Sequence, residues 1–193
     1  MKLVRDIGDL SEEDREGAVA IGNFDGVHRG HEGLIQRLVH HARAVSGPAT
    51  VFTFEPHPVR ILRPDFTPPP LTWTHRKAQL LGDLGVDLVV AYPTDNSLLS
   101  LSAKEFFDQI ILKTLAAKAV VEGPNFFFGK DRQGDTKRLK ELCSQHDLTL
   151  EIVTPHSRQD QLISSSRIRA LLADGDVGTA VDLLTQPYRL RGL

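Results

Sequence analysis

Apolar runs alternate with amphipathic segments along most of the chain. Five short apolar runs predict buried strands, at Ala18–Ile21, Ala49–Phe54, Leu88–Ala91, Ala119–Glu122 and Leu148–Val153. Between these runs, apolar residues recur at helical spacing in about Glu32–Val45, Thr74–Leu84, Ala103–Leu115 and Thr136–His146. Alternating strands and helices imply right-handed crossovers between parallel strands. We therefore predict an α/β fold with a Rossmann-like, doubly wound, mostly parallel five-stranded sheet.

A short helical extension is predicted after the fifth strand. The polar stretch His156–Gln161 comes first, and helical patterns follow at Arg167–Ala173 and Val177–Leu184, separated by the turn Asp174–Asp176. The tail Gln186–Leu193 shows no further pattern.

Three local features refine this prediction. Ser102 and Glu105 form a capping box that starts a helix. The segment Arg63–Pro70 contains four prolines, which predicts a surface loop without a regular element, placed where it could cover a ligand. Glu122 ends a strand where an apolar residue is expected, so a buried Glu122 would need a partner.

Composition and charge exclude several classes of protein. Hydrophobic residues make up 40% and charged residues 25%, which is typical of a globular domain. The net charge of −2 provides no general attraction for nucleic acid or an anionic membrane, so neither partner is expected. No signal peptide or membrane-spanning segment is expected from the apolar runs. The single cysteine, Cys143, cannot form an internal disulfide, which favours a cytoplasmic location.

The glycine-rich stretch Ile21–His31 is the first candidate site. It follows a predicted strand and leads into a predicted helix, which places His28 and His31 at a helix N-terminus. Free backbone N–H groups and the helix dipole favour anions there, so the stretch predicts a polyphosphate site. Two incidental histidines at a solvated helix start are the alternative. Zinc is disfavoured because no cysteine or carboxylate cluster accompanies the histidines.

A second candidate site lies in Ile163–Arg169. Three successive serines suit a helix cap, and their hydroxyls together with Arg167 and Arg169 also suit phosphate oxygens. By itself this segment is equally well explained as a helix cap.

Taken together, the motifs resemble the FAD synthetase (FMN adenylyltransferase) domain of the bacterial bifunctional riboflavin kinase/FAD synthetase family, which has a HIGH-type histidine motif. The matching residues are Gly22-x-Phe24-Asp25-Gly26-x-His28-x-Gly30-His31, Phe54-x-Pro56-His57-Pro58, Gly123-x-Asn125-Phe126-x-Phe128-Gly129, Ile163–Arg169, Gly175-Asp176 and Pro187-Tyr188. The resemblance implies transfer of AMP from ATP to FMN, giving FAD and pyrophosphate, with Mg²⁺ as the ion.

The resemblance also implies roles for individual residues. The catalytic residues would be His28, His31 and Arg169. ATP would bind to these three and to Gly22, Phe24, Asp25, Gly26, Ser165 and Ser166. Flavin would bind to Phe54, Pro56, Pro58, Asn125 and Phe128, and Asn125 is also the best protein contact for the metal.

Two alternatives remain at this point. The chain is also compatible with an adenylyl- or cytidylyltransferase acting on another phosphorylated acceptor, and with a non-catalytic flavin- or nucleotide-binding paralogue. We expect an adenylyltransferase domain over residues 1–186, and a tail at 187–193 where a riboflavin kinase domain would begin in the bifunctional family. The sequence leaves open the oligomeric state and whether the chain is an excised domain.

Overall fold

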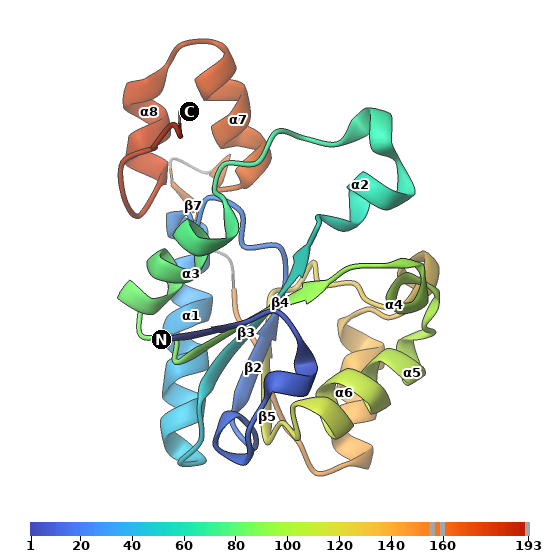
Figure 1. Ribbon diagram of the computed structural model, residues 1–193. Coiled ribbons are helices and arrows are strands. Elements are labelled where there is room, and N and C mark those ends of the chain that lie inside the picture. Colours follow the sequence, from blue (N-terminus) through green and yellow to red (C-terminus); the bar gives the residue numbers. More distant parts are fainter. Residues whose placement is uncertain (155–156, 159–160, 192–193) are drawn as a thin grey trace.

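The core of the fold is a parallel sheet with helices on both faces (Figure 1). The computed structural model describes residues 1–154, 157–158 and 161–191. Within them, six parallel strands follow the order β1-β4-β3-β2-β5-β6. Their bounds are β1 (Lys2–Val4), β2 (Ala18–Ile21), β3 (Ala49–Glu55), β4 (Leu88–Pro93), β5 (Ala119–Glu122) and β6 (Thr149–Ile152). The α/β prediction and the five predicted strands are confirmed.

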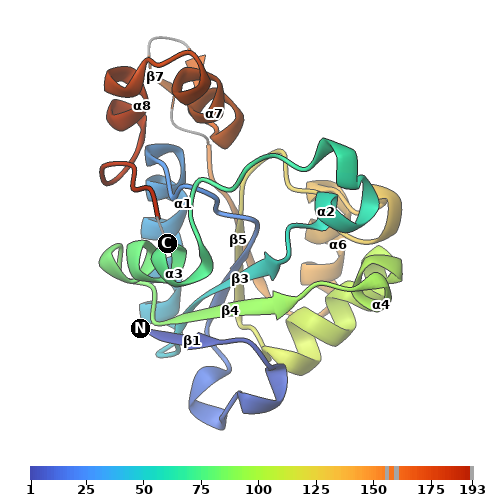
Figure 2. The same ribbon diagram turned by 45° about the horizontal axis from the view of Figure 1, so that its top comes forward.

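The predicted strand number was wrong by one. The additional strand, β1, pairs with β4 at the edge of the sheet, with Lys2 opposite Leu88 and Val4 opposite Val90 (Figure 2). It contains only three residues, which is too short for an alternating pattern to distinguish a strand from a loop.

Helices cover both faces of this sheet. The helices of the described residues are α1 (Arg29–Ala44), α2 (Pro58–Leu62), α3 (Thr74–Asp83), α4 (Asn96–Ser100), α5 (Ala103–Phe106), α6 (Thr136–Gln145), α7 (Ser165–Ala173) and α8 (Val177–Leu183), with a π-helix η4 (Phe107–Thr114) and the 3-10 helices η1 (Ile7–Asp9), η2 (Glu12–Asp14), η3 (Pro64–Phe66) and η5 (Lys130–Arg132). One apolar core lies under α1 and α3, and another lies under α5, η4 and α6. Figure 1 shows these two layers on opposite sides of the strands, with α7 and α8 above α1.

Two local predictions need correction. The helix expected over Ala103–Leu115 begins at its capping box, but it continues as a π-helix from Phe107. There the Thr114 hydroxyl donates to the carbonyl of Gln109, five residues earlier, at 2.7 Å. The proline-rich segment Arg63–Pro70 was expected to lack a regular element, yet it contains the 3-10 turn η3. Pro64 starts that turn because its fixed φ suits a first helical position.

The C-terminal extension contains both predicted helices, α7 and α8. Two short antiparallel strands, β7 (Ser157–Arg158) and β8 (Gln161–Leu162), precede them. Part of the polar segment His156–Gln161 and the last two residues of the predicted tail lie outside the described residues.

The strand order places the expected binding region. Strand β2 has β3 on one side and β5 on the other, and the chain crosses to opposite sides of the sheet from this point. In sheets of this type, ligands bind beyond the carboxyl ends of the strands where the order reverses. The segment after β2 is the predicted histidine turn, and the segment after β5 contains the predicted flavin residue Asn125.

Candidate nucleotide-binding site

The histidine turn links β2 to α1. Strand β2 ends at Ile21, His28 occupies the N-cap position of α1, and His31 lies in the first turn of the helix. The His31 amide donates to the carbonyl of His28 at 2.8 Å. This spacing stacks the two imidazole rings, with centroids 3.7 Å apart and planes 15° from parallel.

Neither imidazole has its polar atoms satisfied by the protein. His28 is only 5% exposed. The Nδ1 atoms of both His28 and His31 are buried and have no hydrogen-bond partner among the described residues. Burial lowers the pKa of His28 to about 4. Burial, with smaller contributions from His28 and Lys77, lowers the pKa of His31 well below its usual value. The unsatisfied Nδ1 atoms at a helix N-terminus therefore mark both rings as candidates for contact with a bound oxyanion.

The turn depends on unusual backbone conformations. Phe24 and Val27 adopt φ values of 45° and 41°, and Gly26 adopts 81°. Gly30 serves a different purpose, because a Cβ there would lie 2.9 Å from the carbonyl oxygen of Ile163. The glycines at 26 and 30 thus allow the turn itself and its contact with the segment before α7. Close approach of a phosphate to these glycines stays a prediction.

Asp25 anchors the turn to two distant segments. Its carboxylate is 7% exposed and accepts hydrogen bonds from the amide of Leu71, the amide and hydroxyl of Thr72, and the guanidinium of Arg169. Because this carboxylate is fully engaged with the chain, its geometry suits positioning of the turn. A direct contact of Asp25 with ATP stays a prediction.

Helix α7 is bound to the same turn. Ser164 caps the helix by accepting from the Arg167 amide at 3.3 Å, and the Ser165 hydroxyl donates to the carbonyl of Asp25 at 2.8 Å. Arg169 donates to the carbonyl of Pro69 at 2.7 Å as well as to Asp25. Ser166 is exposed at the first turn. The structure thus brings together two segments that lie far apart in the sequence.

The predicted flavin residues divide between core and surface. Phe128 is 6% exposed and stacks on Phe126, with centroids 5.3 Å apart. Phe54 meets Phe52 edge to face at 5.5 Å and is partly buried against the same core. Asn125 is exposed at the turn that follows β5.

The remaining two flavin residues, Pro56 and Pro58, lie between β3 and α2. Both are partly buried, and Pro58 is the first residue of α2. The predicted flavin residues therefore lie at the end of β3 or after it, and after β5, and these are the two strands that flank β2. Contact of any of them with flavin stays a prediction.

Glu122 has the partner that its position requires. It is 2% exposed, and its Oε1 accepts from the amide of Ile21 at 2.7 Å. Strands β2 and β5 are in register only at Ala18 with Ala119 and at Val19 with Val120. The Glu122 side chain supplies an acceptor at the point where these strands separate. Burial raises the pKa of this carboxyl well above its usual value.

Sequence reasoning missed Lys77, a basic residue close to the turn. Lys77 lies on α3 and is 9% exposed, and its ammonium group donates to the Thr53 hydroxyl at 3.2 Å. The sequence does contain a signal for a buried Lys77. Lys77 precedes Leu81 by one helical turn, so it lies on the apolar face of α3 to which Leu81 belongs. A lysine on such a face is unusual enough to mark it.

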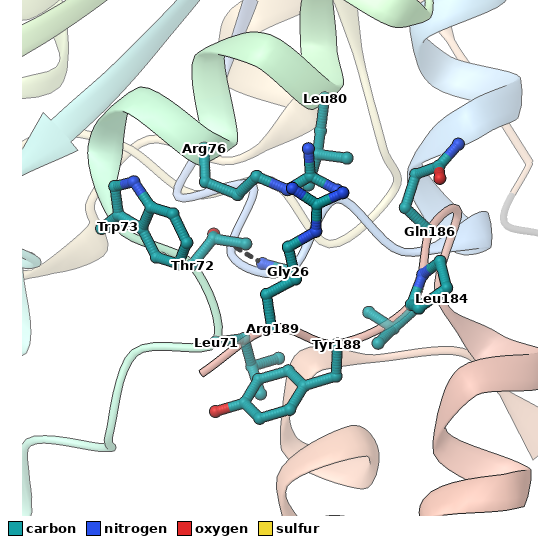
Figure 3. A pocket seen from close by; sticks show the side chains of 11 residues that line it. Gly26, Leu71, Thr72, Trp73, Arg76, Leu80, Leu184, Gln186, Tyr188 and Arg189 are labelled. Carbon is teal, nitrogen blue, oxygen red and sulfur yellow. Dashed lines mark hydrogen bonds between the residues drawn. The ribbon is translucent and has the colours of Figure 1, made fainter. Parts of the chain in front are cut away.

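A small pocket opens on another side of the histidine turn (Figure 3). Gly26 and the start of α3, including Trp73 and Arg76, line one part of it, and Tyr188 of the C-terminal segment lines another. The amide of Gly26 donates to the Thr72 hydroxyl at 3.2 Å. The described part of the predicted tail thus packs beside the turn.

Two kinds of feature are absent from the described residues. No group of three or more His, Cys, Asp or Glu side chains is arranged to hold a metal ion. No helix there has the length and apolar character needed to cross a membrane.

Known proteins resemble this chain over most or all of its length. The sequence model of the FAD synthetase family matches residues 10–167. Bifunctional riboflavin kinase/FMN adenylyltransferase from Escherichia coli K12 is 35% identical over 193 residues, which cover all of this chain and 62% of the relative. The protein of the same name from Bacillus subtilis is 35% identical over 186 residues, which cover 95% of this chain and 58% of the relative. The chain thus spans about three fifths of the length of these curated relatives.

A solved structure has the same fold. It is described as the crystal structure of a macrolide-efflux protein from Streptococcus pneumoniae, and it aligns with a TM-score of 0.83 and 28% identity. The alignment covers 96% of this chain and 70% of that one. Because the FAD synthetase sequence model spans most of the chain, including the histidine turn, this chain belongs to the FAD synthetase family.

Proposed function

We propose that this chain transfers AMP from ATP to the phosphate of FMN, giving FAD and pyrophosphate. The observation that carries the proposal is the stacked pair His28 and His31 at the N-terminus of α1, whose buried Nδ1 atoms have no partner in the described part of the chain. Membership of the FAD synthetase family supports FMN as the acceptor.

The chemistry requires positioning more than proton transfer. The FMN phosphate is already anionic at neutral pH, so one of its oxygens can attack the α-phosphorus of ATP without a general base. The bond from that phosphorus to the oxygen of the β-phosphate breaks, and pyrophosphate leaves with the electron pair. His28 and His31 donate to the nucleotide phosphates and stabilise the charge that develops.

Helix α7 completes the ATP side of the proposed site. Ser165, Ser166 and Arg169 hold the phosphates, including those of the leaving pyrophosphate. Ser165 and Arg169 already bond to the histidine turn, so nucleotide binding uses their remaining hydrogen-bonding capacity or exchanges some of these bonds. Gly22, Phe24 and Gly26 shape the turn around the nucleotide.

Magnesium fits the site as an ion carried mainly by phosphate. Mg²⁺ keeps several waters and commonly binds through substrate phosphates, so it does not need a cage of protein ligands. The exposed amide of Asn125 is suitably polar and follows β5, next to β2 in the sheet. When bound, the ion neutralises the triphosphate charge.

The flavin side of the proposed site uses the segments after β3 and β5. Phe54, Pro56, Pro58 and Phe128 supply apolar surface to the isoalloxazine ring, and Asn125 supplies a polar contact. The partners are thus the small molecules ATP and FMN. We place the reaction in the cytoplasm, in keeping with the lone, buried Cys143.

An acceptor panel tests the proposal. The protein is incubated with Mg²⁺ and either ATP or CTP, together with FMN, nicotinamide mononucleotide, phosphopantetheine or a polyol phosphate, and dinucleotide and pyrophosphate are measured. We expect FAD and pyrophosphate in equal amounts from ATP and FMN only. Transfer to another acceptor would assign a different substrate, and FMN binding without product would indicate a non-catalytic flavin-binding protein.

A further inference from the structure

Lys77 is a buried cation that the protein itself leaves poorly compensated. The residue is 9% exposed, and among the described residues its ammonium group makes one hydrogen bond, to the neutral hydroxyl of Thr53. That hydroxyl in turn donates to the carbonyl of Asn23 in the histidine turn, at 3.2 Å. No carboxylate forms an ion pair with Lys77 in the part of the chain that the structure describes.

Two acidic groups, Asp25 and Glu55, act on Lys77 without forming an ion pair with it in the described part of the chain. Asp25 and Glu55 raise the pKa of Lys77, but burial is the larger effect and lowers it overall. Asp25 is bound by Arg169 and by the donors of residues 71–72. Glu55 accepts a hydrogen bond from the Thr74 hydroxyl at Oε1, whereas its Oε2 lies 3.7 Å from Arg5 and has no hydrogen-bond partner among the described residues. A buried charge without close compensation costs free energy, so a lysine retained here is best explained by an anion that binds it.

The position of Lys77 indicates which anion this is. Thr53, the hydrogen-bond partner of Lys77, lies on β3. It directly precedes the segment Phe54–Pro58. The charge of Lys77 helps to lower the pKa of His31 and the pKa of His57. In both cases burial has the larger effect. Through Thr53, Lys77 is linked to the histidine turn, on the proposed ATP side, and it contacts the strand that leads to the segment proposed to bind flavin.

We propose that the Lys77 ammonium binds the phosphate of the acceptor nucleotide and holds it in line with the α-phosphorus of ATP. This inference rests on the proposed function, because it assigns Lys77 to the attacking phosphate of FMN. The acceptor oxygen forms the new bond to the α-phosphorus as the bond to the β-phosphate oxygen breaks. Lys77 keeps its proton throughout and offsets the repulsion between the two anions.

Lys77→Met tests the inference because it keeps the length of the side chain and removes its charge. Flavin affinity is measured with FMN and with riboflavin, which lacks the phosphate, in the presence of Mg²⁺ and a non-hydrolysable ATP analogue. We expect FMN affinity to fall at least about tenfold while riboflavin affinity is unchanged. FAD formation should fall about a hundredfold or more, the scale of losing one positioned donor. The melting temperature without ligand should be equal or higher, because a buried charge is removed.

Two further variants separate this role from a structural one. Arg76→Met changes another buried cation on the same helix and should leave the ratio of FMN to riboflavin affinity unchanged. Lys77→Gln keeps a donor for Thr53 without the charge, and it replaces the Met variant if that variant does not fold. The Lys77 inference is overturned if FMN and riboflavin affinities fall equally, if neither changes, or if the wild type binds both flavins with equal affinity.

The proposed reaction and the Lys77 site fail in different ways. If the wild type makes no FAD but Lys77→Met selectively loses FMN affinity, the proposed reaction is wrong and the phosphate site at Lys77 stands. A wild type that makes FAD, combined with unaltered FMN selectivity in the variant, would keep the reaction and remove Lys77 from it.

Discussion

The histidine turn and helix α7 contribute to the same candidate site, but they differ in what their polar groups already hold. The buried Nδ1 atoms of His28 and His31 have no hydrogen-bond partner within residues 1–154, 157–158 and 161–191. On α7, Ser165 and Arg169 are hydrogen-bonded to the turn through Asp25. The turn therefore presents free groups to a ligand, whereas α7 also maintains the shape of the turn. Substitutions in the turn should mainly reduce activity, and substitutions in α7 should reduce both activity and stability.

The largest expected effect is on turnover and comes from the turn. His31→Ala should lower the rate of FAD formation about 10²- to 10³-fold, because it removes a donor placed for developing charge. Steady-state kinetics with FMN, ATP and Mg²⁺ measure this loss. His40→Ala is the control, since His40 is exposed on the same helix. Near-normal turnover in His31→Ala would remove His31 from the proposed mechanism.

The next effect is the dependence of stability on pH. The pKa of His28 is about 4 in the folded protein and about 6.5 when unfolded, so the unfolded chain binds more protons between these values. Stability from this group is present above pH 6.5 and is lost as the pH falls towards 4. The loss amounts to about 3 kcal/mol. Chemical denaturation at several pH values should show that the free energy of unfolding of His28→Asn falls less steeply with decreasing pH than that of the wild type. If the free energies of unfolding of the variant and the wild type change equally with pH, His28 is not the source of this pH dependence.

A smaller loss of stability should come from α7. Arg169→Ala breaks the contact with Asp25 and the one with Pro69, and it leaves a mostly buried carboxylate with one donor fewer. We expect a loss of about 2 kcal/mol, below the range for fully buried pairs because Arg169 is partly exposed. Urea unfolding measures it, with Arg138→Ala as the control at an exposed pair with Glu141. Equal losses of stability in Arg169→Ala and Arg138→Ala would contradict the claim that α7 stabilises the turn.

The smallest effect concerns the sheet beneath the turn. Because burial raises the pKa of Glu122, the folded protein retains a proton that the unfolded chain releases above about pH 4.5, and stability falls as the pH rises. Glu122→Gln keeps an acceptor for the Ile21 amide and removes this ionisation. The variant should be more stable than the wild type at pH 7 and similar to it near pH 4. Destabilisation at pH 7 would mean that the carboxyl is needed for a contact that an amide cannot make.

The sequence was most informative where a periodic pattern was long. The five predicted strands and the helices at 29–44, 74–83 and 136–145 have strong apolar periodicity, which identified their type and approximate limits. Strand β1 and the π-helix η4 escaped prediction for different reasons. Three residues carry too little pattern, and an apolar stripe does not distinguish an α-helix from a wider π-helix.

At the site, sequence motifs identified groups but not their partners. His28 and His31 were found because they follow a glycine turn, and the Ser164–Arg169 cluster was found through its run of hydroxyls. The role of Asp25 as an anchor depends on contacts with residues 71–72, which no spacing rule predicts. Lys77 was missed because helical periodicity directs attention to apolar residues, whereas the informative residue was the charged one among them.

The central claim is that the turn and α7 bind the same nucleotide. A double-mutant cycle of His31→Ala and Ser166→Ala tests it directly, with the affinity for ATP and Mg²⁺ as the measured quantity. No hydrogen bond joins these two residues in the part of the chain that the structure describes, so a coupling that is larger in ATP affinity than in the free energy of unfolding without ligand indicates a shared nucleotide. We predict a coupling free energy of about 0.5 kcal/mol or more. Strictly additive effects would contradict the claim.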